Sequence, residues 1–392
     1  MGRFSILRLI VLCSLCLDLG FVQAFTGTYG INYGQISDNI PGPENVVKLL
    51  KAAKIKNVRI FDSNHTVIEA FKGSGLELIV GLSNEHVKDM NASEDKALDW
   101  VEDNVQQFLP ETPIRGIAIG NEVLGGSDQE LEQALVGAVK NVYRALDRLH
   151  LTNLVQVLTS HSQNVFASSY PPSSCVFNEN IVQYMKPLLE FFTKIGSPFN
   201  INVYPFIAYK GDSANIDINY ALFQSDSGIY DEKSDLHYDN MFDATVDAAY
   251  FALQDAGYEQ MEVIVTETGW ASSGDEDEAG ATVQNARTYN FNLRKRLAKR
   301  RGTPHRPKIV MKAYIFALFN EDLKSGPGSE RHYGLYKPDG TIAYDIGFPS
   351  LKKSHASLSL LSIKHIYAQG GLGPYTNVLI ACTTVLLLVL IR

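Results

Sequence analysis

The sequence predicts an α/β fold and, within that class, a single (β/α)8 TIM barrel. Short apolar runs rich in β-branched residues alternate with longer amphipathic stretches from about Phe25 to Phe348. No Ser/Pro-rich or low-complexity linker divides this region, so a single domain is expected over residues 25–348. Eight apolar runs can be counted, and eight strands alternating with helices fit a closed barrel better than a doubly wound open sheet.

The predicted strands are the apolar runs, and each ends on a polar or aromatic residue. They are expected at Gly27–Tyr33, Asn57–Asp62, Glu77–Asn84, Ile114–Glu122, Leu154–His161, Phe199–Phe206, Glu262–Trp270 and Lys308–Asn320. In a parallel barrel the carboxyl ends of all strands share one face, and active sites are built on that face. The polar residues at the ends of the runs are therefore expected to surround one cleft.

The predicted helices lie between these runs. They are expected at Pro43–Ala53, Thr66–Phe71, Glu94–Phe108, Asp128–Leu149, Ile181–Phe192, Asp239–Asp255 and Gln284–Arg301. The acidic run Asp275 to Glu278, which precedes the last helix, is interpreted as a solvated loop, with the alternative that it borders a cleft.

Composition excludes several other classes of protein. The chain has 392 residues, of which 45% are hydrophobic, enough to bury a large core. The 35 basic and 43 acidic residues leave a net charge of −8, so the chain lacks the positive field that nucleic acids require. Only Cys175 lies outside the apolar termini, which excludes a disulfide scaffold. No HExxH, GxGxxG, P-loop or GxSxG motif occurs and the histidines lack metal-ligand spacing, so neither a metal nor a cofactor is expected.

The amino terminus has the pattern of a secretory signal peptide. Residues 1–24 carry Arg3 and Arg8, an apolar run, and small residues before the expected cleavage after Ala24. A membrane-spanning anchor is the alternative, but Asp18 interrupts the run. Two glycosylation sequons, at Asn64 and Asn91, can be used only if the chain enters the secretory pathway.

The carboxyl terminus has the layout of a glycolipid (GPI) anchor signal. A linker and turn-rich spacer at 349–377 precedes an apolar tail at 378–392, which would be removed when the lipid is attached. The sequence leaves the attachment point open among Ala368, Gly370 and an upstream serine such as Ser357. A short tail anchor and a vacuolar sorting extension are the alternatives. We expect attachment to the outer face of the plasma membrane, facing the cell wall.

Two glutamates, Glu122 and Glu267, end apolar strands. A buried carboxylate is costly unless it is paired or used, so the alternatives are an ion pair beneath the barrel rim or a catalytic role. If both face one cleft, two carboxyl groups can share the acid/base and nucleophilic work at a glycosidic bond. Sugars also need stacking and hydrogen-bonding side chains, and such residues stand near the strand ends: Tyr33, Asn121, Tyr204, Phe206 and Trp270.

At these residues the sequence resembles glycoside hydrolase family 17, the plant endo-β-1,3-glucanases. The resemblance runs from about Thr28 to Phe348. The segments that carry it are Tyr29 to Gln35 with Asp38 to Pro41, Gly120-Asn121-Glu122, Thr266 to Trp270, Phe319 to Lys324, and Ser329 to Leu335. The family usually has proline after the tryptophan, where this chain has Ala271, and this departure puts the rigidity of the loop in doubt. The cysteine-rich carbohydrate-binding module is absent after Phe348, so the barrel's own groove must capture substrate.

The resemblance implies a retaining mechanism with Glu122 as acid/base and Glu267 as nucleophile. It also implies that Asn121 bonds the sugar 2-hydroxyl, and that other residues support or line the subsites: Tyr33, Tyr204, Trp270, Glu321, Lys324, Glu330 and Tyr333. The expected substrate is a β-1,3-glucan such as callose, cut internally by a monomeric enzyme. A mixed-linkage β-1,3;1,4-glucan hydrolase and a catalytically silent glucan-binding wall protein remain as alternatives.

Overall fold

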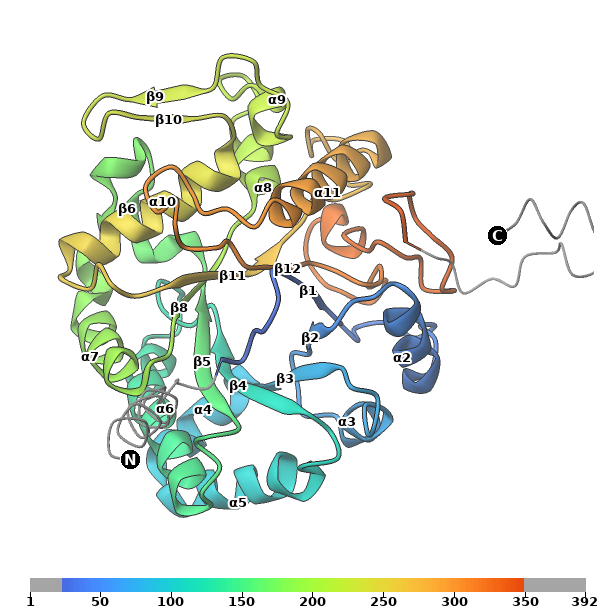
Figure 1. Cartoon of the computed structure of the whole chain (residues 1–392), viewed down its shortest axis with the longest axis vertical. Helices are drawn as coiled ribbons and strands as arrows, with labels where there is room; N and C mark the ends of the chain where they lie inside the picture. Colours follow the sequence, from blue (N-terminus) through green and yellow to red (C-terminus); the bar gives the residue numbers. More distant parts are fainter. Residues whose placement is uncertain (1–22, 349–392) are drawn as a thin grey trace, which may run out of the picture. The chain divides into compact units, whose positions relative to one another are not determined.

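The computed structural model describes residues 23–348, which form a closed barrel of eight parallel strands (Figure 1). The order of the strands around the barrel follows their order in the chain, and the last strand pairs with the first. This confirms the predicted (β/α)8 fold. The barrel strands are β1 (Tyr29–Asn32), β2 (Asn57–Arg59), β3 (Glu77–Leu82), β4 (Ile114–Asn121), β5 (Gln156–His161), β8 (Phe199–Asn202), β11 (Val263–Thr268) and β12 (Ala313–Ile315).

Most strands are shorter than the apolar runs that predicted them. The run from Lys308 to Asn320 supplies only the three residues of β12, and the run from Phe199 stops at Asn202. Pro205 begins helix α8 (Pro205–Gly211) because proline lacks the N–H that a central strand would donate. The apolar residues beyond the strand ends are still buried, since they line the loops at the rim of the barrel.

In the described part of the chain, the helices that surround the barrel are six to twenty residues long. They are α2 (Pro43–Ala52), α3 (His65–Ala70), α4 (Asn84–Ala92), α5 (Glu94–Asn104), α6 (Gln129–Arg148), α7 (Glu179–Ile195), α10 (Met241–Asp255) and α11 (Val283–Ala298). Helix α4 was not predicted, because its separation from α5 depends on one extended residue, Ser93. The side chain of Ser93 accepts a hydrogen bond from the backbone N–H of Lys96 and so starts α5 anew.

The region between β5 and α10 carries small elements that the sequence did not predict. They are β6 (Phe166–Ser168), β7 (Val176–Phe177), α9 (Ile218–Ala221), β9 (Ile229–Asp231), β10 (Leu236–Tyr238), η2 (Gln163–Val165) and η3 (Pro172–Ser174). In Figure 1 the β9–β10 hairpin and α9 lie together beside α10. Asp231 joins the η3 segment to this hairpin, because its carboxylate accepts hydrogen bonds from the N–H of Ser173 at 2.8 Å and from its hydroxyl at 2.6 Å.

The floor of the barrel is closed by the start of the described chain. Ala24 and Phe25 are buried at the amino ends of the strands, and the Phe25 ring packs against Tyr314 of β12 with centroids 4.4 Å apart. The N–H of Ala24 donates to the side-chain oxygen of Gln156 at 3.3 Å. Inward residues of four further strands complete the same apolar cluster: Ile79, Ala118, Leu158 and Ile264. The interior of the barrel is therefore closed at this end.

Of the predicted signal peptide, residues 1–24, the structure describes only Gln23 and Ala24, and the predicted linker and tail after Phe348 lie outside the described residues. Within residues 23–348, no helix combines the length and apolar character needed to cross a membrane. The same part of the chain contains no cluster of His, Cys, Asp and Glu side chains suited to holding a metal ion.

Candidate active site

A cavity of about 480 Å³ opens at the carboxyl ends of the barrel strands. It contains both predicted catalytic glutamates and every residue predicted to contact substrate except Phe206 and Trp270. The connections after β1, β2, β4, β8 and β12 contribute to its wall, together with Glu267 on β11. The lining residues are Tyr33, Gly34, Gln35, Ile36, Phe61, Asp62, Asn121, Glu122, Tyr204, Ile207, Glu267, Phe316, Glu321, Lys324, Glu330 and Tyr333.

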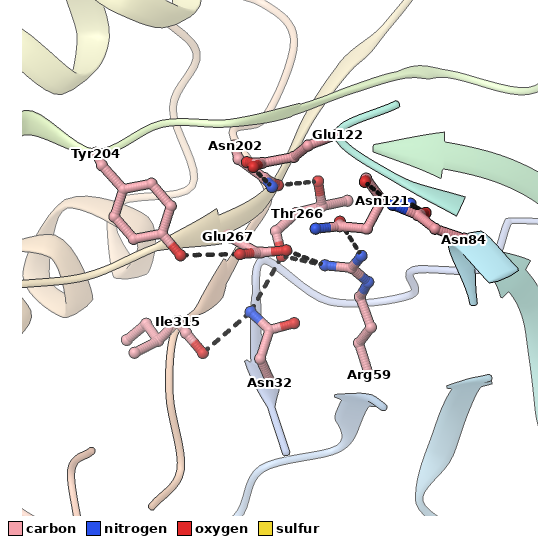
Figure 2. A network of polar contacts seen from close by, with 10 residues as sticks. All are labelled: Asn32, Arg59, Asn84, Asn121, Glu122, Asn202, Tyr204, Thr266, Glu267 and Ile315. Carbon is pink, nitrogen blue, oxygen red and sulfur yellow. Dashed lines mark hydrogen bonds and ion pairs between the residues drawn. The ribbon is translucent and has the colours of Figure 1, made fainter. Parts of the chain in front are cut away.

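Glu267 lies on β11 and is held by two donors from opposite sides of the barrel (Figure 2). Its Oε1 atom pairs with Nη1 of Arg59 at 2.8 Å, and its Oε2 atom accepts a hydrogen bond from the Tyr204 hydroxyl at 2.9 Å. Arg59 is only 1% exposed. The guanidinium therefore supplies the counter-charge that a buried carboxylate needs. The ion pair considered as the structural alternative is present, and Glu267 nevertheless lines the cavity.

Glu122 follows directly after the last residue of β4 and takes a backbone conformation that turns its side chain into the cavity. Its φ is +53°, in the left-handed region that few side chains adopt, and Gly120 two residues earlier has φ +64°. The N–H of Glu122 donates to the carbonyl of Ser160 at 2.8 Å, which fixes this turn against β5. Strained backbone of this kind is often kept where a side chain must be aimed.

The two glutamates have different electrostatic surroundings. Burial, and then repulsion from Glu267, raise the pKa of Glu122 above its usual value. The side-chain amide of Asn202 donates to Oε1 of Glu122 at 2.7 Å and opposes this rise. Glu267 instead contacts a cation. Glu122 is thus biased toward the protonated form while Glu267 lies against a guanidinium, which is the arrangement that acid and nucleophile roles require.

A polar network beneath the cavity fixes the strand ends in register. Arg59 bridges two of them, because Nη2 donates to Oδ1 of Asn121 at 2.8 Å while Nη1 pairs with Glu267. Asn84 exchanges hydrogen bonds with the backbone of Asn121, at 2.7 Å and 3.0 Å. The amide of Asn32 donates to carbonyls of β11 and β12 (Figure 2). This network makes the positions of Asn121 and Glu267 depend on each other.

Sequence reasoning missed Arg59 and Asn202. The sequence nevertheless contained a pattern that could have indicated each of these two residues. Arg59 is a basic residue inside an apolar strand, and such a residue must find an acidic partner when it is buried. Asn202 alternates with apolar residues in Phe199-Asn200-Ile201-Asn202, the spacing that directs polar side chains to one face of a strand. Phe61, Ile207 and Phe316 also line the cavity and were not predicted.

Glu321, Lys324 and Glu330 come from the segment after β12 and form one side of the cavity. Oε1 of Glu321 accepts a hydrogen bond from the N–H of Ile36 at 3.0 Å, and burial raises the pKa of Glu321. Lys324 pairs with Glu330 at 3.2 Å. Gly34 leaves the space that Glu321 fills, since a Cβ atom at that position would lie 2.3 Å from its carboxylate oxygen.

The aromatic residues divide into two groups. Tyr204 and Tyr333 line the cavity with ring centroids 5.7 Å apart, and Tyr33 lies across from them after β1. Trp270 is fully buried and does not line the cavity. Its indole N–H donates to the carbonyl of Gly280 at 2.8 Å and its ring packs against Phe206. Phe206 is fully buried as well and is not a cavity-lining residue. The structure therefore places both Trp270 and Phe206 behind the cavity wall rather than in it.

Residues 29–348 match the sequence model described as glycosyl hydrolases family 17. The chain belongs to this family. The match to the family 17 model includes both glutamates and the whole set of cavity residues.

Relatives within family 17 cover most of the chain. Glucan endo-1,3-beta-glucosidase 11 of Arabidopsis thaliana is 44% identical over 343 residues, which is 87% of this chain and 80% of the relative. Glucan endo-1,3-beta-glucosidase 14 of the same plant is 44% identical over 318 residues, or 81% of each chain. Among solved structures, CJP38, a beta-1,3-glucanase and allergen of Cryptomeria japonica pollen, is 41% identical with a TM-score of 0.78, over 83% of this chain and 100% of that one.

Proposed function

We propose that this family 17 chain hydrolyses internal β-1,3-glucosidic bonds of a linear β-1,3-glucan such as callose, with retention of configuration. One observation carries the proposal: Glu122 and Glu267 line one cavity but have opposite electrostatic surroundings. The names of the plant relatives support the β-1,3 linkage.

In the proposed mechanism Glu122 donates its proton to the glycosidic oxygen while Glu267 attacks the anomeric carbon. The C–O bond to the leaving sugar breaks, a glycosyl ester forms on Glu267, and Glu122 is left as a carboxylate. Glu122 then removes a proton from water, whose oxygen attacks the same carbon and releases Glu267. Retention requires the two carboxyl groups to be about 5–5.5 Å apart.

The remaining cavity residues would hold the sugar rings. Asn121, oriented by Arg59 and Asn84, is suited to the 2-hydroxyl next to the reacting carbon. Tyr33 and Tyr333 line the cavity as buried aromatic walls that would bound the subsites. Tyr204 has a further role, because its hydroxyl is bonded to the proposed nucleophile and must share that carboxylate with the transition state. Glu321, Lys324 and Glu330 supply hydrogen bonds to other hydroxyls.

The proposed activity is tested by digesting a pure linear β-1,3-glucan and following the products by NMR. Oligosaccharides of mixed length, released first as the β-anomer, are expected from an endo-acting retaining enzyme. Release of the α-anomer would contradict retention. Faster hydrolysis of a mixed-linkage β-1,3;1,4-glucan would overturn the linkage assignment. Tight binding without release from any β-glucan would indicate a silent glucan-binding protein.

We also propose that the mature protein is secreted and held at the outer face of the plasma membrane by a GPI anchor. Support comes from the sequence patterns at the two ends and from the exposed position of both sequon asparagines, Asn64 and Asn91. A phospholipase specific for GPI anchors should release the protein from a membrane pellet. Retention in the pellet after this treatment would favour a spanning tail, and recovery without any treatment would argue against an anchor.

The hydrogen bond from Asn202 predicts a specific change in pH dependence. This bond lowers the pKa of Glu122, so Asn202→Ala should raise it further. A general acid must be protonated, and therefore the alkaline limb of kcat/KM should move to higher pH by roughly half a unit to one unit. The profile is measured on a β-1,3-oligosaccharide, with the exposed Asn215→Ala as control. A limb that moves to lower pH would contradict the assignment of Glu122 as the acid.

A further inference from the structure

The loop between β11 and α11, residues 271–281, is tied to two other segments at the cavity rim. It contains the acidic run that was interpreted as solvated. That interpretation is wrong for Glu278, which is only 7% exposed, although Glu276 and Asp277 in the same run are exposed. A buried carboxylate needs several hydrogen-bond donors, and the structure provides them.

Four donors converge on the Glu278 carboxylate. Oε1 contacts Nζ of Lys210 at 2.8 Å and the hydroxyl of Ser329 at 2.5 Å. Oε2 accepts hydrogen bonds from the N–H of Ser329 at 2.7 Å and from the N–H of Asp275 at 2.9 Å. Asp275 in turn accepts from the N–H of Gly328 at 2.7 Å. We call these five residues, Lys210, Asp275, Glu278, Gly328 and Ser329, the Glu278 clamp.

The clamp joins three segments that are distant in sequence. Lys210 belongs to α8, Asp275 and Glu278 to the loop after β11, and Gly328 and Ser329 to η4 (Gly328–Arg331). Two of these segments carry cavity residues close by: Ile207 lies on α8, and Glu330 lies on η4. A second link runs beside the clamp, because the backbone and hydroxyl of Ser272 both donate to the carbonyl of His332, next to Tyr333.

We propose that Glu278 is a positioning residue for substrate binding, which fixes α8 and η4 so that Ile207, Glu330 and Tyr333 meet the glucan in one arrangement. This inference rests on the proposed function. It also accounts for Ala271, where the family resemblance leads one to expect proline: the loop is held from outside by charge-assisted hydrogen bonds rather than by a restricted backbone.

The clamp is separate from the chemistry. Glu122 and Glu267 are held by Arg59, Asn202 and Tyr204, and the described residues show no hydrogen bond between this group and the clamp. Weakening the clamp should therefore loosen binding more than it slows the chemical step. Burial alone would raise the pKa of Glu278, but the bonds from Lys210, Ser329 and Asp275 outweigh it and lower the pKa to about 2. The Glu278 carboxylate thus stays charged at neutral and mildly acidic pH.

The test compares Glu278→Gln with Glu276→Gln, an exposed glutamate of the same run. Glutamine offers one oxygen and places an NH2 group against donors, so at least two of the four bonds are lost. We expect KM for a β-1,3-oligosaccharide to rise about tenfold while kcat stays within about threefold. Hydrogen exchange of residues 271–281 and 325–333 should become faster. The control should match the wild type in all three measurements.

Two results would overturn the proposal. An unchanged KM with faster exchange would mean that the clamp is only structural, and a kcat that falls as much as KM rises would place it in the chemical step. If Glu278→Gln does not fold, Ser329→Ala removes one side-chain donor and should raise KM about threefold. If the wild type cleaves no glucan, the proposed function fails, and the clamp is then judged by oligosaccharide Kd and hydrogen exchange alone.

Discussion

Glu267→Gln should lower kcat by about 10⁴-fold or more and still bind β-1,3-oligosaccharides. The amide cannot form the glycosyl ester, yet it has the shape of the carboxylate and keeps an oxygen for the Tyr204 hydroxyl. Arg59 would then face a neutral group, so some loss of stability is also expected. The measurements are single-turnover hydrolysis, oligosaccharide binding by calorimetry, and a denaturation curve for each variant.

Glu259→Gln is the matched control for this substitution. Glu259 is exposed and precedes the amino end of β11, away from the cavity. It should behave as wild type in activity, binding and stability. If Glu267→Gln retains activity within a few-fold of the wild type, the assignment of Glu267 as nucleophile is wrong. If it loses binding together with activity, the substitution has disturbed the cavity and the roles must be reassigned.

Arg59→Met should have the second largest effect, on both activity and stability. The substitution removes the buried counter-charge of Glu267 and the donor to Asn121 in one step. Leaving one member of a buried ion pair alone costs about 3–5 kcal/mol of unfolding free energy. We also expect kcat to fall about 100-fold or more, since both the nucleophile and Asn121 lose their orientation.

Arg59→Met should also change the pH dependence through Glu122. The guanidinium lowers the pKa of the Glu122 carboxyl, so without it that pKa rises and the alkaline limb of kcat/KM should move to higher pH. Arg59→Lys keeps a positive charge but lacks the fork that reaches two partners, and should give an intermediate result. Wild-type kcat in Arg59→Met would show that the ion pair has no part in catalysis. Urea unfolding supplies the stability of each variant.

The barrel could be predicted from the sequence because its strands are buried on both faces. Such strands appear as continuous apolar runs, and all eight runs contain a barrel strand. Their ends could not be predicted, because a buried loop is as apolar as a buried strand. The residues after Ile315 show this, since they are buried at the rim but no longer belong to β12. The β6–β7 and β9–β10 hairpins were missed because strands of two or three residues carry too little pattern.

The site was predictable where a residue type was unusual for its place. Glu122 and Glu267 stood out as carboxylates at the ends of apolar strands, and the structure brings both into one cavity. The sequence did not show which of these residues would form ion pairs or hydrogen bonds with each other. Arg59 meets Glu267 across the barrel, and Glu278 meets Lys210 and Ser329, through contacts set by tertiary structure alone. Trp270 was predicted to contact substrate because it lies beside a catalytic strand end, but it is fully buried and packs against other residues.

The closed floor of the barrel has a consequence for the order of events during synthesis. Phe25 packs on Tyr314, and β1 pairs with β12, so the first and last parts of the barrel must meet before either is sheltered from water. During translation, the apolar start of the domain therefore stays exposed to water until almost the whole domain has been synthesised. Contacts so distant in sequence slow folding and leave an aggregation-prone intermediate. This domain should accordingly depend on chaperones while it folds, and truncation after β11 should yield insoluble protein.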